Sequence, residues 1–391
     1  MKKFRPIAVH LPQFHPIPEN DEWWGKGFTE WTNVAKATPK FKNHYQPHLP
    51  SDLGFYDLRL EEARLEQEKL AKEYGIYGFC YYHYWFNGKT LLHEPIERKL
   101  NNAKEDFPFM LCWANENWTR VWDGGHRNVL MEQQYSNEDH VEHLKYLIPF
   151  FKDKRYITID GKAVFAVYRS TKIPDFEEVC KLWKNEAAKE GVELYIIRFE
   201  SFGEKIKNIQ EGTFDAAAEF QPHVGVNIFN GMKPNNPQLQ QAHKTLRDEI
   251  SVQTFLSSIR YRLNKFRRKN QKSKQEKPKT KIIEYSDFVD KCLAYDEQNV
   301  NDYKIYSCVS PGFDNSARRK EGALVIHNST PQLFGRWISE KLISTPTYSS
   351  EENLFFINAW NEWAEGNHLE PDQKWGRQYL EALKKAFADY I

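Results

Sequence analysis

The sequence lacks the motifs that mark several large classes of enzyme. No Gly-x-Gly-x-x-Gly follows its first strand-like segment, so nothing in it indicates a dinucleotide-binding fold. It has neither the Gly-x-Ser-x-Gly elbow of serine hydrolases nor the His-Glu-x-x-His spacing of zinc hydrolases. We therefore expect that the chain uses neither a catalytic metal nor an organic cofactor.

Cysteine is scarce, and its spacing is wide. The five cysteines are Cys80, Cys112, Cys180, Cys292 and Cys308, and no Cys-x-x-Cys occurs. An odd number of distant cysteines argues against a disulfide framework and against a thiolate zinc site. Three of them, Cys80, Cys112 and Cys308, lie inside strand-like runs, where we expect small buried hydrophobic residues.

A strong net charge and a long apolar run are also missing. Lys and Arg number 55 and Asp and Glu 54, so the net charge is +1 and gives no field that would steer nucleic acid. No apolar run approaches the length of a membrane span. The apolar stretch behind the basic start covers only residues 7–11, too short for a secretory signal. These features predict a cytoplasmic location.

Aromatic residues, in contrast, are abundant. Phe, Trp and Tyr make up 15% of the chain, and many stand beside Asn, Gln, Glu or His rather than in plain apolar runs. Such a mixture suits a site that stacks on sugar rings and hydrogen-bonds their hydroxyls. A core that is merely rich in aromatic residues is the alternative interpretation.

Short apolar runs alternate with amphipathic, charge-rich segments. The expected strands are 6–14, 75–85, 107–115, 163–168, 193–199, 214–221, 305–310 and 355–360. The expected helices are 55–74, 94–103, 136–151, 175–190 and 374–391. This alternation predicts an α/β protein with a parallel sheet, and eight strands favour a single (β/α)8 TIM-type barrel over residues 1–391.

Nearly every expected strand is apolar at its start and polar or aromatic at its end. The active site of a (β/α)8 barrel forms where its strands end, and a polar residue buried there without a partner would be costly. The sequence therefore predicts substrate contacts at or near these ends, from His10, Gln13, Trp31, His83, Trp85, Trp113, Asn115, Glu116, Arg198, Glu200, Glu219, Gln221, Trp360, Asn361 and Trp363.

Two segments do not fit the repeat. Residues 15–54 form a long stretch rich in Trp and Pro, which we expect to be an ordered loop over the strand ends. Residues 225–303 form a helical insertion between strands six and seven, with a basic stretch at 260–281. That stretch is either a solvated helix and linker or a contact for an anionic surface, such as a lipid-linked phosphate or the inner membrane leaflet. No nucleic-acid-binding motif accompanies the charge.

The local pattern with the clearest chemistry is Ile357-Asn-Ala-Trp-Asn-Glu-Trp-Ala-Glu-Gly366. Positions i and i+3 of a strand face opposite sides, so Glu362 and Glu365 share one cavity only if the chain turns between them. Gly366 favours such a turn, and Trp360 and Trp363 would wall the cavity. Two carboxyl groups in an apolar cleft have different pKa values, as glycoside cleavage requires.

Two other interpretations of these carboxylates remain open. Glu362 and Glu365 could form a structural ion-paired or helix-capping pair. Glu116 or Glu219, which also follow strands, could replace one of them as the acid.

Three blocks of the sequence resemble a known family. Residues 10–33, His44-Tyr-Gln-Pro-His-Leu-Pro50 and Asp52-Leu-Gly-Phe-Tyr-Asp57 resemble the opening signature of WbsX-like proteins, which carry a glycoside hydrolase family 99-like domain. The closing Trp360-Asn-Glu-Trp-Ala-Glu-Gly366 is similar to the catalytic motif of family 99 endo-mannosidases and endo-mannanases. The family usually has Tyr where His10 stands, which leaves the exact sugar subsite open.

The resemblance implies a metal-free barrel that acts with retention on α-mannoside-like linkages. Carried over, Glu362 is the base on the sugar 2-hydroxyl, which gives an epoxide-like intermediate, and Glu365 is the general acid/base. It also implies a substrate in bacterial surface polysaccharide or its lipid-linked precursor. The alternatives are a glycosyltransferase that uses an activated sugar, although no Asp-x-Asp-like site is present, and a glycan-binding protein without turnover.

Overall fold

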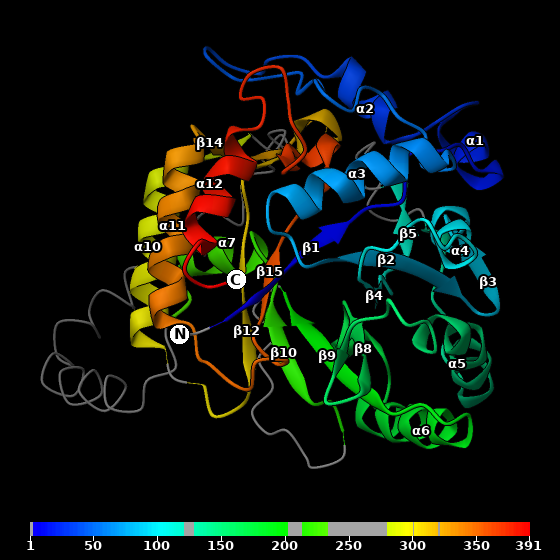
Figure 1. Ribbon diagram of the computed structural model, residues 1–391. Helices are drawn as coiled ribbons and strands as arrows, with labels where there is room; N and C mark the ends of the chain where they lie inside the picture. Colours follow the sequence, from blue (N-terminus) through cyan, green and yellow to red (C-terminus); the bar gives the residue numbers. More distant parts are fainter. Residues whose placement is uncertain (1–2, 121–128, 202–212, 234–279, 300, 320) are drawn as a thin grey trace, which may run out of the picture.

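The computed structural model describes residues 3–120, 129–201, 213–233, 280–299, 301–319 and 321–391. Eight parallel strands form its centre: β1 (Arg5–His10), β2 (Gly78–Phe86), β4 (Phe109–Trp113), β8 (Lys162–Val167), β9 (Leu194–Glu200), β10 (Ala216–Glu219), β12 (Ile305–Val309) and β15 (Leu354–Ile357). The sheet closes because β1 pairs with both β2 and β15 (Figure 1). The predicted (β/α)8 barrel and its strands are confirmed.

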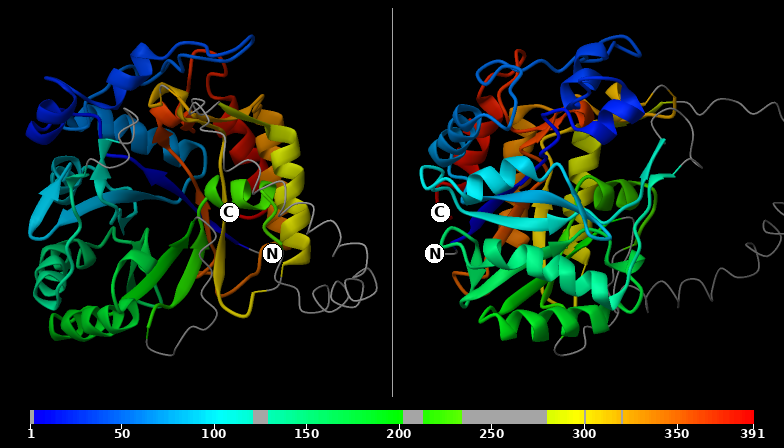
Figure 2. Two further views of the ribbon diagram at one scale, coloured as in Figure 1. Left: turned by 180° about the vertical axis from the view of Figure 1, so that it is seen from behind. Right: turned by 90° about the vertical axis from the view of Figure 1, so that its right-hand side faces the viewer.

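Helices surround this barrel (Figure 2). They are α3 (Glu61–Glu73), α4 (Glu94–Leu100), α5 (Asn137–Phe151), α6 (Phe176–Lys189), α7 (His223–Phe229), α10 (Tyr285–Gln298), α11 (Pro331–Ser344) and α12 (Gln378–Phe387). All five expected helices are present, but α3 begins at Glu61 rather than at residue 55. Helix α11 was not predicted, although the Thr330 hydroxyl accepts the Leu333 N–H and Pro331 occupies the first turn, both ordinary start signals.

Close packing of the strands explains one glycine of the barrel. A Cβ atom at Gly78, the first residue of β2, would lie 2.7 Å from the Pro108 carbonyl oxygen. Only glycine allows the two chain segments to approach this closely. All nine residues of β2 are buried, because the barrel covers one face and the helices cover the other.

The segment 15–54 lies over the ends of the strands, as predicted (Figures 1 and 2). It contains two short helices, α1 (Pro18–Trp24) and α2 (Glu30–Lys36), within the predicted loop. A small sheet of β11 (Lys281–Glu284), β14 (Leu324–His327) and β13 (Phe313–Asp314) lies outside the barrel.

The insertion between β10 and β12 contributes α7, β11 and α10 to the structure. Its basic stretch at 260–281 lies outside the described residues except for the last two, so the predicted surface contact stays a prediction. The assignment of residues 1–391 to one domain also stays a prediction.

Cys80, Cys112 and Cys308 are buried as predicted, and Cys180 and Cys292 are buried too; all five are free. In the described ranges, no helix combines the length and apolar character that crossing a bilayer requires.

Candidate active site

The segment after β15 forms a tight turn that brings the two predicted glutamates together. Residues Asn361–Glu362 (β16) pair antiparallel with Asn367–His368 (β17), and Trp363–Glu365 forms a 3-10 turn between them. Gly366 closes the turn with φ of 55°, in the left-handed region that favours glycine. A Cβ atom there would also lie 3.0 Å from Asp314 Cβ. The structure therefore contains the turn that Glu362 and Glu365 need in order to face the same cavity.

The Arg318 guanidinium holds both glutamates. Its Nη1 lies 2.8 Å from Glu365 Oε1, and its Nη2 lies 3.0 Å from Glu362 Oε2. The same Nη2 lies 2.8 Å from Oε1 of a third carboxylate, Glu30. Arg318 follows β13, so the charge that organises the site comes from the loop between β12 and α11.

Glu30 supports the turn from a buried position. It lies in the first turn of α2, and its side chain is fully buried. Its Oε1 accepts the backbone N–H of Ala364 at 2.8 Å, and its Oε2 is 3.4 Å from the Gln13 amide. Glu30 thus fixes both the 3-10 turn and Arg318, which makes it a positioning residue.

Charge in this cluster is unbalanced. Three carboxylates contact one guanidinium, so the cluster tends to retain a proton near neutral pH. Burial raises the pKa of Glu362 to about 8, and the nearby Glu365 and Glu30 add to the rise, whereas Arg318 opposes it. The pKa of Glu365 is also raised by burial, against the effect of Arg318. Burial alone would lower the pKa of Arg318, but the carboxylates hold it well above its usual value.

Glu362 and Glu365 open into a cleft of about 400 Å³ at the C-terminal end of the barrel. Its aromatic lining comes from Trp24, Tyr82, Tyr84, Trp118, Tyr168, Phe220 and Phe313. The Glu362 side chain is 9% exposed and that of Glu365 25%, so the second carboxyl group is more accessible. Buried phenol groups near these carboxylates have raised pKa values and remain hydrogen-bond donors.

Polar groups contribute another part of the cleft wall. Asn358 donates its Nδ2 to the Gln221 carbonyl at 2.7 Å, and this contact fixes its Oδ1 as an acceptor. That oxygen is buried and has no hydrogen-bond partner in the described part of the chain. Glu116, at the end of β4, is ion-paired with Arg169 and lines the same cleft. The wall therefore offers groups that can bind hydroxyls.

Two of the predicted binding residues on β2 lie on the wrong face. His83 and Trp85 point toward α5: His83 Nε2 is 2.9 Å from His143 Nε2, and the Trp85 indole donates to Asp139 at 3.0 Å. The cleft receives their neighbours Tyr82 and Tyr84 instead. Successive side chains of a strand face opposite sides, so a shift of one residue exchanges the two sets.

Six other predicted side chains also lie outside the lining of the cleft. Trp113 is buried against α5 and α6, Asn115 binds the Arg169 carbonyl, and Gln221 accepts the Gly225 N–H. Arg198 pairs with Glu200 at 2.6 Å, and Glu219 pairs with Lys341 of α11 at 2.9 Å. None of these six side chains lines the cleft; Glu219 in particular is not available as the acid. Of the predicted binding residues, Gln13 and Glu116 do line it.

The remaining predicted residues form a layer behind the turn that carries Glu362 and Glu365. Asn361 Oδ1 accepts the Leu11 N–H at 2.7 Å, and Asn361 Nδ2 donates to the Leu11 carbonyl oxygen at 3.0 Å. Trp360 and Trp363 are buried and are not walls of the cavity. Trp363 donates to Glu370 at 2.6 Å, and Trp31 packs on it with ring centroids 5.5 Å apart.

His10 belongs to the same supporting layer. Its Nε2 is 3.1 Å from Gln67 Oε1, and Gln67 donates to Glu370 at 2.7 Å. Burial lowers the pKa of His10 to about 3, so the ring is neutral. His10 therefore acts through this network and does not contact the cleft.

Sequence reasoning missed Glu30 and Arg318, which lie 288 residues apart. Neither lies near Glu362 and Glu365 in the sequence, and only the fold brings them together. Tyr82 and Tyr84 could have been predicted from the sequence, because they belong to the aromatic run that ends the second expected strand.

Comparison with known proteins identifies a family. The family model described as "Glycosyltransferase WbsX" matches residues 6–383. Two relatives, both called "Uncharacterized protein WxcX" and both from Xanthomonas campestris pv. campestris, are 34% identical over 385 residues. The match covers 97% of the chain, which spans about half the length, 49%, of these relatives.

Two solved structures share the fold. One, named "Glycoside hydrolase-like protein", has a TM-score of 0.58 at 13% identity, and the match covers 100% of this chain and 95% of that one. The GH99 endo-alpha-mannosidase from Bacteroides thetaiotaomicron has a TM-score of 0.55 at 11% identity, with 100% and 98% covered. At these identities the likeness concerns the fold alone.

Proposed function

Because the chain belongs to the WbsX family, we propose that it is a glycan-active enzyme whose reaction takes place at Glu362 and Glu365. One observation carries this proposal. Two glutamates with raised pKa values share one arginine at the mouth of an aromatic cleft, at the end of a barrel where catalytic sites of this fold lie. Aromatic walls for sugar rings and paired carboxyls for acid–base work are what glycosidic chemistry requires.

The proposed reaction is cleavage of an α-mannoside-like linkage with retention, with water or another sugar as acceptor. Glu362 takes the proton of the sugar 2-hydroxyl, and the 2-oxygen of the sugar forms a bond to the anomeric carbon. At the same time, Glu365 gives a proton to the leaving oxygen, whose bond to the anomeric carbon breaks. In the second half, the acceptor gives its proton to Glu365 and opens the strained ring, and the 2-oxygen recovers its proton from Glu362. These roles follow the family resemblance.

The electrostatics of the site favour the opposite assignment, with Glu362 as the acid and Glu365 as the base. Glu362 is the more buried carboxyl, and its pKa of about 8 favours the protonated form at neutral pH, whereas a base must be ionised. The leaving group distinguishes the two assignments. An acid variant regains activity with an activated leaving group that needs no proton, and a base variant does not.

The test is a screen of α-linked manno-configured glycosides, with product stereochemistry followed by NMR. Glu362→Gln and Glu365→Gln are expected to lower turnover roughly 10²–10⁴-fold each, with unchanged circular dichroism. A fluoride or nitrophenyl substrate should restore Glu365→Gln selectively. Glu381→Gln, at an exposed glutamate of α12 that does not line the cleft, is the matched control. Full turnover in both variants of the pair would overturn the proposal.

The printed family description favours a second candidate, a glycosyltransferase that uses an activated sugar. Calorimetric titration with guanosine diphosphate mannose separates the two. Tight binding, followed by sugar transfer to an acceptor glycan, would support the transferase. Binding of glycan without any product would instead support a glycan-binding protein.

The substrate would be bacterial surface polysaccharide or its lipid-linked precursor, and the reaction would take place in the cytoplasm. Contact of the basic residues 260–281 with an anionic membrane belongs to this proposal as well.

A further inference from the structure

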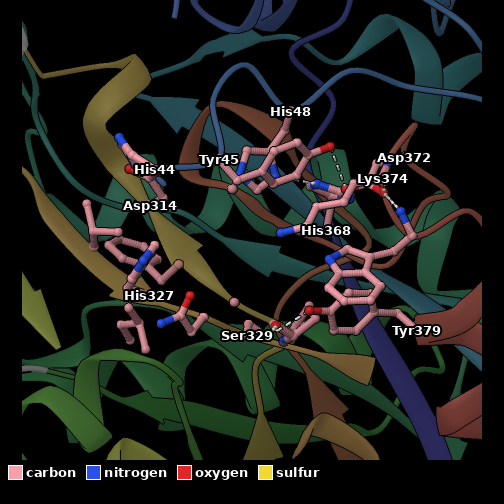
Figure 3. A pocket seen from close by; sticks show the side chains of 18 of the residues that line it. His44, Tyr45, His48, Asp314, His327, Ser329, His368, Asp372, Lys374 and Tyr379 are labelled. Atoms are coloured by element: carbon pink, nitrogen blue, oxygen red, sulfur yellow. Dashed lines mark hydrogen bonds and ion pairs between the residues drawn. The ribbon is translucent and has the colours of Figure 1, made fainter. Parts of the chain in front are cut away.

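A second cavity, of about 80 Å³, lies beside the catalytic turn (Figure 3). Gly366 of the turn lines it, and Phe313 lines both this cavity and the cleft. Three potential metal ligands meet in it: His48, His368 and Asp372. One donor atom of each lies within 4.8 Å of the other two.

The protonation of His368 can be deduced from its partner. Its Nδ1 is 2.9 Å from the Glu370 carbonyl oxygen, which only accepts hydrogen bonds, so Nδ1 carries the proton. Nε2 therefore presents a lone pair, 3.1 Å from His48 Nδ1. This is the arrangement of metal-bound histidines, in which the other ring nitrogen donates to a backbone carbonyl or a carboxylate.

Asp372 is held in place in a similar way. Its Oδ1 accepts the backbone N–H groups of Lys374 and Trp375, at 3.0 and 2.6 Å. Its Oδ2 accepts the Tyr45 hydroxyl at 3.1 Å and retains a further lone pair. These contacts orient both carboxylate oxygens, and none of them comes from a positively charged side chain.

The surroundings favour neutral imidazoles, the form that binds metal. Burial lowers the pKa of both His48 and His368. His368 stacks on Trp363, with ring centroids 3.8 Å apart. Space for His48 depends on Gly366, since a Cβ atom there would lie 3.3 Å from His48 Cε1.

We propose that His48, His368 and Asp372 bind one divalent transition-metal ion, with Zn²⁺ as the ion that fits best. Two imidazole nitrogens and one carboxylate oxygen are a common zinc ligand set. Ligands at about 2.0–2.1 Å from a tetrahedral zinc stand roughly 3.3 Å apart, close to the 3.1 Å between the two nitrogens. Water in the cavity would occupy the fourth position.

Such an ion would join two distant parts of the chain. His48 belongs to the segment 15–54, whereas His368 and Asp372 follow the catalytic turn, and Figure 3 shows their side chains facing one another. The metal would fix the covering segment to the turn through the stack of His368 on Trp363. Its role would be structural and independent of the chemical step, so this proposal does not rest on the proposed function.

The test measures metal directly in the purified chain after removal of any affinity tag. The protein is stripped with EDTA, incubated with Zn²⁺, desalted and measured by plasma mass spectrometry. We expect about one zinc per chain and a higher Tm in the zinc-loaded protein. Co²⁺ in place of zinc should give the visible absorption of a tetrahedral site.

Variants assign the site to these residues. His48→Gln and Asp372→Asn are expected to lose the zinc and the cobalt spectrum. His327→Gln, which lines the same cavity outside the three ligands, should keep both. The proposal fails if the wild-type chain retains no stoichiometric zinc, in which case His48 and His368 share an N–H···N hydrogen bond. Equal zinc in wild type and His48→Gln would overturn it as well; if neither ligand variant folds, the wild-type zinc and cobalt measurements decide alone.

Discussion

Two clusters of buried charge in this protein use the same residue types in opposite ways. Between α3 and α4, Arg64 donates two hydrogen bonds to Glu105, at 2.9 and 2.7 Å, and Lys99 lies 2.5 Å from Glu68. These four side chains are at most 5% exposed. At the catalytic turn, one arginine contacts three carboxylates that border a cleft.

The difference lies in charge balance and access. Two acids and two bases balance in charge, and the cluster at α3 ties helices together; burial raises the pKa of Glu68 there as well. Three acids contact one arginine at the cleft, and burial raises the pKa of Glu362, so the second cluster holds a proton beside the cleft. The two clusters therefore differ in their balance of contacting charges and in whether they border a cleft.

Removal of Arg318 should cause the largest change. Arg318→Met leaves Glu30, Glu362 and Glu365 without their shared cation, which raises the carboxyl pKa values further and releases both side chains. We expect kcat/KM to fall roughly 10²–10³-fold, measured on the substrate from the glycoside screen. Turnover within threefold of wild type would show that the cluster is only structural.

The same substitution in the balanced cluster should affect stability instead. Arg64→Met strands the buried Glu105, and such a change costs about 3–5 kcal/mol in the free energy of unfolding. Urea denaturation measures this loss, and turnover by the folded fraction should stay near wild type. A variant with normal stability but impaired turnover would contradict the division between the two clusters.

The pH dependence of stability tests the unbalanced charge. The pKa of Glu362 rises from 4.5 to about 8 on folding, so between these pH values the folded chain binds more protons than the unfolded chain. The contribution of Glu362 to stability is therefore greatest below pH 4.5 and is lost as pH rises toward 8. Glu362→Gln should stabilise the protein at pH 8 by on the order of 1–3 kcal/mol relative to pH 5. Calorimetry at both pH values measures it; an equal effect at both would refute a raised pKa.

The smallest effect tests which face of β2 meets the substrate. Tyr84→Phe removes a hydroxyl from the cleft and should lower kcat/KM roughly 10-fold, the worth of about 1–1.5 kcal/mol. Trp85→Phe removes the hydrogen bond to Asp139 behind the strand, so it should cost about 1 kcal/mol of stability and leave kinetics unchanged. The reverse pattern would restore the predicted face.

The catalytic turn shows how far local sequence reaches. Its short polar sequence with a following glycine predicted that Glu362 and Glu365 lie together, and the structure has that turn. The residues expected to wall the cavity, Trp360 and Trp363, are buried behind it instead. The spacing of residues in the sequence predicts which of them are neighbours, but it does not predict which side of a turn faces solvent.

The strands show the same limit on a larger scale. In β2, every position is buried, so no alternation of apolar and polar residues marks the inner face. The aromatic run was correctly predicted as a strand that ends at the site, yet His83 and Trp85 were chosen where Tyr82 and Tyr84 line the cleft. A register error of one residue is invisible in a strand that is covered on both faces.

The sequence by itself determined the barrel, because eight apolar runs alternating with amphipathic segments can bury their surfaces in few other ways. It also predicted a turn between Glu362 and Gly366, because the two glutamates can share one cavity only if the chain turns between them and glycine favours such a turn. Only the tertiary structure decided which faces meet the cleft and which partners the glutamates have. Glu30 and Arg318 are 288 residues apart, and contacts at such separations follow from how the whole barrel closes, which no local pattern records.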